Sequence, residues 1–381
     1  MAVRRIGGLV AIAAMLASLL AFLPTTSVAA QGAAVTVAEG ESIQAALDAA
    51  EPGTTITVEA GVYDEALVIR TDGITLRGEE GAVISPGDAT SECEFFGFYD
   101  AICIAADYFV NEAGQSDSNE TIYDVTVSGF TINNVGGAGV GVVRGDNITI
   151  SDNSVTKAGC DSFYVISSND FEVSRNVSKK ASQVLGFCNG ITVVNSTDGL
   201  VSRNKVLNGA GTAILVNDSH RIRVERSKVV GNCNGIIMTQ DPGLPLGLKN
   251  IKVTNNTVSR NNKTCQSFLF FGIELTTGGV GIGTLGGDKI QIKNNKVTKN
   301  VVSDDQLPMG GTGIFIGDDI NVFTGEFRES VGRVSVNRNK VTGNIVNGVE
   351  TDIAVDTVDG NVKVNRNTCG VSSPDPAWCG G

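Results

Sequence analysis

A short segment recurs along this chain, and the repeat limits the possible folds more than any other feature. Each copy has a brief alternation of apolar and polar residues, a polar corner and another apolar residue: NITISDNSV from Asn147, RIRVERSKV from Arg221, NIKVTNNTV from Asn250, KIQIKNNKV from Lys289, RVSVNRNKV from Arg333 and NVKVNRNTC from Asn361. Alternation with a period of two indicates short strands rather than helices.

Aligning the copies places one polar residue in a common column: Asn153, Asn176, Asn204, Ser227, Asn256, Asn295, Asn339 and Asn367. The shortest interval is 23 residues, which suits one three-strand coil of a parallel β-helix, and longer intervals suit a coil plus a loop. A leucine-rich repeat would need a Leu-dominated consensus and a propeller a period of about 40. Stacked amides at the coil corners form hydrogen-bonded ladders, so we interpret the column as structural rather than as a ligand site.

The start of the chain is typical of an export signal. Arg4 and Arg5 precede an apolar run and the small residues 27–30, so we predict that residues 1–30 are a signal peptide that is removed. A retained membrane anchor is the alternative, and no later segment is apolar enough to cross a membrane. Eight cysteines without a CxxC pair indicate disulfides in a secreted or cell-envelope protein.

The mature chain predicts one all-β solenoid, because it lacks Pro- or Ser-rich linkers and is long for a single ordinary core. Residues 31–60 predict a cap strand and a capping helix from about Ile43 to Ala50, with Ser42 as N-cap. The β-helix follows over residues 61–370, and a disulfide-pinned tail over 371–381. Loop insertions are predicted near 91–124, 240–249, 261–288 and 300–332.

Offsets from the ladder column predict the disulfide pairs. Cys160 and Cys188 fall 7 and 12 residues after ladder residues of consecutive coils, and Cys233 and Cys265 fall 6 and 9 residues after theirs. Proximity alone completes the set, which pairs Cys93 with Cys103 and Cys369 with Cys379.

Residues 40–79, GESIQAALDAAEPGTTITVEAGVYDEALVIRTDGITLRGE, resemble the first coil of right-handed parallel β-helix proteins of the pectate-lyase-like superfamily. With the repeats, the resemblance covers nearly all of the mature chain and implies a right-handed helix. The superfamily includes polysaccharide lyases, uronan epimerases, pectin esterases, glycoside hydrolases and phage tailspikes, so it implies no single reaction. Residues 279–287 are similar to a stretch of polygalacturonases, but Gly279 and Val280 replace the Gly-His pair, and the Asp-Pro-His-Glu motif of uronan epimerases is missing.

Charge is unevenly distributed along the mature chain. The net charge is −20 over residues 31–172, +11 over 173–300 and −5 over 301–381. Basic residues flank the ladder column, at positions that strand alternation turns outward. We predict a binding track for an acidic polysaccharide or cell-wall polymer at Arg203, Lys205, Arg226 and Lys228; a solvated edge is the competing interpretation. Nucleic acid is not expected as a partner of an acidic exported protein.

Catalytic candidates are fewer. A lyase or epimerase needs a base and a charge neutraliser, roles open to His220, Arg221 and Arg223. A hydrolase needs two facing carboxylates, for which the candidates are Asp304, Asp318 and Asp319. The same acid pairs, Asp304-Asp305 and Asp318-Asp319, are candidate Ca²⁺ ligands, against solvated loop acids; no other cofactor is indicated.

The insertion at 91–124 is rich in aromatic residues that either stack on sugars or pack the loop: Phe95, Phe96, Phe98, Tyr99, Tyr108 and Phe109. We expect the later insertions, 240–249, 261–288 and 300–332, to form one wall of a groove. The predicted function is binding of an extracellular polysaccharide, with its cleavage or modification left open. A non-catalytic structural or adhesive rod is the alternative.

Overall fold

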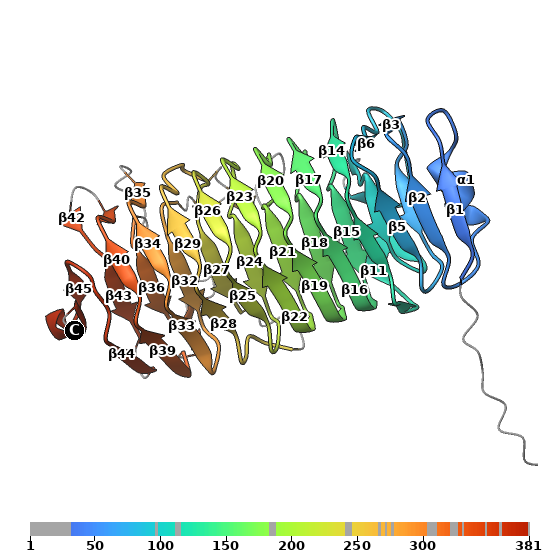
Figure 1. Ribbon diagram of the computed structural model, residues 1–381. Helices are drawn as coiled ribbons and strands as arrows, with labels where there is room; N and C mark the ends of the chain where they lie inside the picture. The colour runs from blue at the N-terminus through green and yellow to red at the C-terminus, as the bar shows by residue number, and fades with distance from the viewer. Residues whose placement is uncertain are drawn as a thin grey trace, which may run out of the picture. The chain divides into compact units, whose positions relative to one another are not determined.

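Short parallel strands stack into three long sheets in the computed structural model (Figure 1). The structure describes residues 32–379 apart from 96–97, 111–115, 183–187, 241–245, 266–267, 271–272, 276–277, 303–310, 321–326, 330, 347–348 and 358–359. The predicted signal peptide therefore lies outside the described residues.

Each full coil contributes one strand to each sheet. Sheet A contains β1 (Ala34–Val37), β2 (Thr55–Val58), β5 (Thr75–Gly78), β13 (Thr126–Ser128), β16 (Gly145–Ser151), β19 (Asn169–Ser174), β22 (Thr197–Ser202), β25 (Arg223–Glu225), β28 (Lys252–Thr254), β33 (Ile290–Lys293), β39 (Arg333–Asn337) and β44 (Asn361–Asn365), with β12 (Ile122–Tyr123) paired to β16. Sheet B contains β3 (Gly61–Tyr63), β6 (Ala82–Ile84), β14 (Thr131–Asn133), β17 (Ser154–Thr156), β20 (Val177–Lys179), β23 (Lys205–Leu207), β26 (Lys228–Val230), β29 (Thr257–Ser259), β34 (Lys296–Thr298) and β40 (Lys340–Thr342).

The third sheet and the short strands complete the architecture. Sheet C contains β4 (Leu67–Ile69), β9 (Ile102–Ile104), β15 (Val140–Val143), β18 (Phe163–Ile166), β21 (Ile191–Val194), β24 (Ile214–Asn217), β27 (Ile236–Thr239), β32 (Ile282–Leu285), β36 (Ile314–Gly317), β43 (Ile353–Asp356) and β45 (Ser372–Ser373). Outside these sheets lie β7 (Glu94–Phe95), β8 (Phe98–Tyr99), β10 (Tyr108–Val110), β11 (Ser116–Ser118), β30 (Phe268–Phe270), β31 (Ile273–Leu275), β35 (Val301–Val302), β37 (Asp319–Ile320), β38 (Phe327–Glu329), β41 (Ile345–Val346) and β42 (Val349–Glu350). The predicted all-β parallel helix is confirmed.

In-register pairing stacks identical side chains inside the coil. On sheet B the central residue of each three-residue strand is buried, and these residues are paired from coil to coil: Val206, Val229, Val258, Val297 and Val341. The flanking positions point outward, as the period of two requires. Burial of these aliphatic columns is the main stabilising term of the stack.

The predicted corner ladder is present and buried. Asn256 is representative: its Oδ1 accepts the Ser227 N–H at 2.9 Å, and its Nδ2 donates to Val224 O at 2.9 Å. Each rung thus satisfies backbone groups of the neighbouring coil that the turn leaves unpaired. Ser227 is the short rung, and its Oγ accepts the Asn204 N–H at 3.2 Å.

A second buried amide column was missed by the sequence interpretation. Its members each stand five residues after a ladder residue: Asn232, Asn261, Asn300 and Asn344. Asn232 N–H donates to Asn261 Oδ1 at 3.0 Å, and Asn261 N–H to Asn300 Oδ1 at 3.1 Å. The constant offset of five was visible in the sequence. Two polar corners therefore hold each of these coils.

The N-terminal helix α1 spans Ile43–Asp48, with Ala49 as its C-cap, so it ends slightly before the predicted Ala50. Ser42 caps it by accepting the Ala45 N–H, and Ile43 and Leu47 are buried in the core. Its role in closing the stack stays a prediction. A 3₁₀ helix, η1 (Pro376–Cys379), lies in the C-terminal tail.

Four disulfides connect the cysteines in the predicted pairs: Cys93–Cys103, Cys160–Cys188, Cys233–Cys265 and Cys369–Cys379. The register inferred from the ladder offsets is therefore confirmed at Cys160–Cys188 and Cys233–Cys265. In the described part of the chain, no helix has the length and apolar character needed to cross a membrane.

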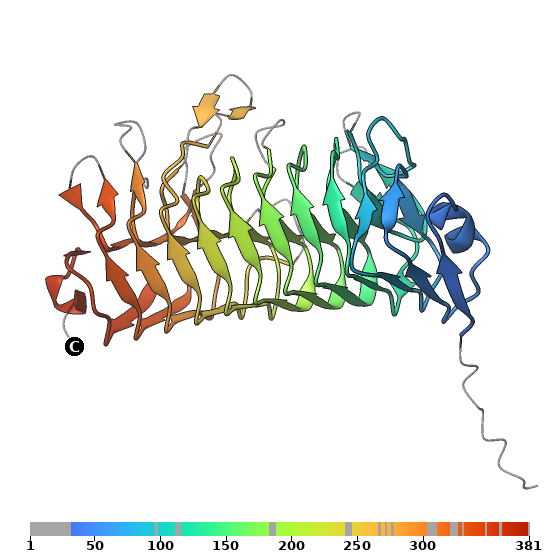
Figure 2. The ribbon, with the colours of Figure 1, turned by 45° about the horizontal axis from the view of Figure 1, so that its top comes forward.

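The prediction that the later insertions form one wall is wrong. Residues 240–249 follow β27 of sheet C, whereas the connection from β29 to β32 precedes a strand of the same sheet. Because the strands of sheet C are parallel, one connection lies at the carboxyl ends of these strands and the other at their amino ends. Segment 300–332 includes residues at both ends, since β36 lies within it. Within the segment before β32, the hairpin β30–β31 stands away from the coils (Figure 2).

Candidate functional site

The four residues of the predicted anion track are exposed on neighbouring coils. Lys205 and Lys228 are direct register partners of β23 and β26. Arg203 and Arg226 occupy the preceding corners, where φ values of 55° and 54° turn the chain sharply from sheet A into sheet B. The ladder residues between these cations, Asn204 and Ser227, are buried, so the alternation of side chains points the cations on either side outward.

The track continues as a larger surface, which we call the basic face. It is the outward side of sheet B and its two corners from β20 to β40. The segments that form it contain Lys or Arg in every coil and no Asp or Glu: RNVSKK (175–180), RNKVLN (203–208), RSKVVG (226–231), NNTVSR (255–260), NNKVTK (294–299) and RNKVTG (338–343). In the first of these coils, Arg175 pairs with Asp152 at 2.8 Å and lies 3.9 Å from Glu172. The described ion pairs include no other cation of this face, so from β23 onward it has a positive potential that neighbouring side chains do not cancel.

Cations elsewhere on the stack are differently placed. Around sheet A, Arg221 pairs with Asp198, and Arg333 pairs with Asp288 at 3.0 Å. Hydrogen bonds from Arg333 hold the pKa of the Asp288 carboxyl well below its usual range. Among the described residues, the ion pairs include none of Arg203, Lys205, Arg226 and Lys228.

The structure does not bring the predicted catalytic residues together. His220 lies in backbone bridges with Thr197 and Lys249, while Arg221 is engaged by Asp198 and Arg223 is exposed on sheet A. Asp318 follows sheet C strand β36, is buried, and accepts the Val331 N–H at 2.7 Å.

The other acid candidates give no described site. Asp304 and Asp305 lie outside the described residues, and of Asp319 only the backbone is described, in β37. Within the described ranges, no cluster of three His, Cys, Asp or Glu side chains could hold a metal ion. The Ca²⁺ site stays a prediction.

An acid–phenol cluster at the start of sheet C strands was not predicted; Asp100 and Tyr164 are buried in it, and Asp161 is half-buried. Asp100 stands two residues before β9, and Asp161 two residues before β18, with one coil between them. Asp100 Oδ1 accepts the Ala138 N–H at 2.8 Å, and its Oδ2 accepts the Tyr164 hydroxyl at 2.6 Å. Asp161 Oδ1 accepts the Thr192 hydroxyl at 2.9 Å.

Burial perturbs the titration of these groups. It raises the pKa of Asp100 to about 7 against the lowering effect of the Tyr164 and Ala138 hydrogen bonds. Burial likewise raises the pKa of Asp161 to about 7. The Tyr164 pKa is raised by burial and by the nearby Asp100 charge. In the sequence, these two acids are indicated only by their equivalent positions, each two residues before a strand of sheet C.

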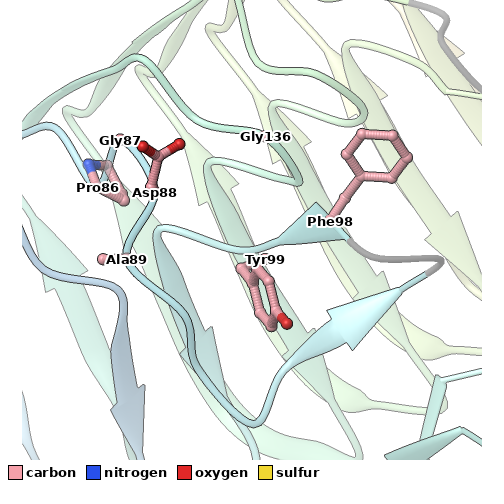
Figure 3. Close-up of a pocket in the computed structure, with 7 residues that line it drawn as sticks. All are labelled: Pro86, Gly87, Asp88, Ala89, Phe98, Tyr99 and Gly136. Atoms are coloured by element: carbon pink, nitrogen blue, oxygen red, sulfur yellow. The ribbon is translucent and has the colours of Figure 1, made fainter.

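Next to this cluster lies a pocket of about 240 Å³ (Figure 3). It is lined by Pro86, Gly87, Asp88, Ala89, Phe98, Tyr99 and Gly136. Two of the six insertion aromatics thus face a cavity. Tyr108 instead packs against the outer side of sheet C and hydrogen-bonds Ser116. Phe96 lies outside the described residues, the Phe95 side chain is not described, and Phe109 is half-buried in β10.

Comparison with known proteins places the chain by fold. A family model described as a right-handed β-helix region matches residues 115–258. No curated protein matches the sequence. Similar solved structures include a hyperthermoactive exopolygalacturonase of Thermotoga maritima, with TM-score 0.56 and 11% identity, covering 84% of this chain and 79% of that one.

Two further structures have the same fold. A polygalacturonase of Erwinia carotovora has TM-score 0.52 and 14% identity, covering 90% of this chain and 96% of that one. The A-module of a mannuronan C-5 epimerase of Azotobacter vinelandii has TM-score 0.50 and 16% identity, covering 87% and 93%. The chain therefore has the right-handed parallel β-helix fold of these structures.

Proposed function

We propose that this protein acts outside the cell or in the cell envelope by binding an acidic polysaccharide along the basic face. The observation that carries the proposal is the acid-free surface of sheet B, with exposed cations in every coil from β20 to β40. Four disulfides support an oxidising compartment, where a removable signal peptide would direct the chain.

The electrostatics favour an anionic partner. In-register lysines such as Lys205 and Lys228 repel each other, and no carboxylate on this face offsets that repulsion. A polyanion would relieve the repulsion and release its own bound counterions, so binding should weaken as salt is added. The chain carries −12 overall, so a general attraction to polyanions would not arise from its net charge.

Fold-level likeness adds a weaker argument. The similar structures are named as polygalacturonases and a mannuronan epimerase, which act on polysaccharides. At such low identity this is analogy, since one fold supports many chemistries. We assign no reaction, because Asp100 is buried with both oxygens hydrogen-bonded and the other catalytic candidates do not converge.

The test is retention of the purified protein on an immobilised polyuronate at two salt concentrations. The quadruple variant Arg203→Gln, Lys205→Gln, Arg226→Gln, Lys228→Gln should elute earlier and show a shallower salt dependence, with level or raised thermal stability. A matched control, Lys252→Gln, Lys289→Gln, Lys293→Gln, Lys363→Gln, removes the same charge from the side of sheet A and should elute like wild type.

Equal retention of wild type and the sheet B variant, or retention of neither, would remove the binding function and favour the structural rod. Absorbance of unsaturated uronates and release of reducing ends, followed in the same samples, would show whether the bound polymer is also cleaved.

A further inference from the structure

We infer that the ligand is a linear polyanion that lies along the stack, across the strands of sheet B, and presents about one anionic group to each coil. This inference rests on the proposed function and specifies the direction and charge density of its ligand. Its basis is a single file of register partners: Lys205, Lys228, Thr257, Lys296 and Lys340.

The file is regular because the backbone beneath it is regular. Lys228 N–H donates to Asn204 O at 2.8 Å, and Lys296 N–H to Asn256 O at 2.8 Å. Each such bond links the file residue to the ladder residue of the preceding coil. The spacing along the file is therefore the rise of one coil, about 4.8 Å.

The coil spacing determines how many positive charges the file carries per unit length along the stack. It does not determine the position of each ammonium group, because lysine side chains are long and flexible. A polysaccharide with an acid on every sugar repeats its charge at a spacing close to one coil. A polysaccharide with an acid on every second sugar supplies half that density. The basic face should therefore prefer the denser polymer at equal total carboxylate.

Direction follows from the shape of sheet B. Its strands from β20 to β40 are three residues long, so a chain lying parallel to a strand would cross the face within one coil. Cations recur instead from coil to coil, both in the file and at the corner that contains Arg203, Arg226 and Arg338. A ligand lying along the stack meets both rows.

Thr257 interrupts the file between Lys228 and Lys296, and it is exposed. This gap supplies a gain-of-function test. Thr257→Lys should raise affinity for a soluble polyuronate roughly two- to fivefold at low salt and steepen the salt dependence. Thr257→Glu should lower the affinity. Thr149→Lys, an outward threonine of sheet A strand β16, adds the same charge away from the file and should leave affinity unchanged.

The experiment measures binding of wild type and these variants to a homopolymeric polyuronate and to hyaluronan, matched in carboxylate concentration, with thermal melting to verify folding. Tighter binding of the polyuronate, with a gain specific to Thr257→Lys, is the expected result. Equal binding of both polymers, or an equal gain from Thr149→Lys, would overturn the inference while leaving polyanion binding intact. Binding of neither polymer would overturn the proposed function itself.

Discussion

The Tyr164 hydroxyl donates a hydrogen bond of 2.6 Å to Asp100 Oδ2 across a sequence separation of 64 residues. The bond joins the side chain of a sheet C strand to a carboxyl two coils earlier, over the intervening β15. Gly141, on the intervening β15, is the register partner of Tyr164, and a Cβ there would lie 2.2 Å from the Tyr164 ring. Glycine at this position is what allows the ring to reach Asp100.

This contact predicts a pH dependence of stability. The pKa of Asp100 is raised to about 7 in the folded chain, above its value near 3.8 when unfolded, so the folded state retains the proton longer. The stability from this group is therefore fully present below about pH 4 and is lost as the pH rises through 7, by roughly 4 kcal/mol at most. Asp100→Asn, which cannot ionise, should make that segment of the stability curve less steep and leave the contribution of Asp161.

Urea unfolding of wild type and Asp100→Asn between pH 4 and 8 measures the difference. Tyr164→Phe is the companion variant. The Tyr164 hydrogen bond lowers the Asp100 pKa, so its loss should move the transition to higher pH. Parallel curves for wild type and Asp100→Asn would mean that this carboxyl does not hold its proton in the folded chain.

A second prediction concerns the corner ladder. Asn256→Leu leaves the Ser227 N–H and the Val224 carbonyl without their buried partner, which should cost about 1–3 kcal/mol. Gln291→Leu, at an exposed position of β33, is the control and should change stability little. Polysaccharide binding should be unaffected by either. Lost binding at an unchanged melting temperature would instead make the ladder column a ligand site.

The short rung offers a change in the opposite direction. Ser227 Oγ accepts the Asn204 N–H at 3.2 Å. Serine has no side-chain amide, so it cannot donate to the Val201 carbonyl in the way that Asn256 Nδ2 donates to the Val224 carbonyl. Ser227→Asn should therefore add a hydrogen bond and raise stability by about 1 kcal/mol. Chemical unfolding decides the sign, and a lower stability would show that the corner has no room for the longer side chain.

Local pattern and register account for what the sequence could predict. The period of two and the Asn column determine the three sheets, and offsets from that column determine the Cys160–Cys188 and Cys233–Cys265 pairs. The Tyr164–Asp100 bond could not be predicted, because it depends on how many coils separate two residues across the 91–124 insertion. The basic face was only partly predicted: its four central residues were identified, but the absence of acids required knowing which residues share sheet B.

The last prediction concerns Glu65, whose role the sequence did not indicate. Its carboxylate accepts the Ile43 N–H at 2.8 Å, the Gln44 N–H at 3.0 Å and the Ser42 hydroxyl at 2.8 Å, so it satisfies the free donors at the start of α1. A negative charge there also interacts favourably with the helix dipole.

Glu65→Ala should lower the free energy of unfolding by about 1–2 kcal/mol, in the range of a lost N-cap. Glu80→Ala, at an exposed acid, removes the same charge and should have little effect. Hydrogen exchange at Ile43 and Gln44 should accelerate in the first variant alone. Equal destabilisation by both variants would assign the effect to general charge, whereas unchanged exchange in Glu65→Ala would show that the hydrogen bonds to Glu65 do not protect these two amides.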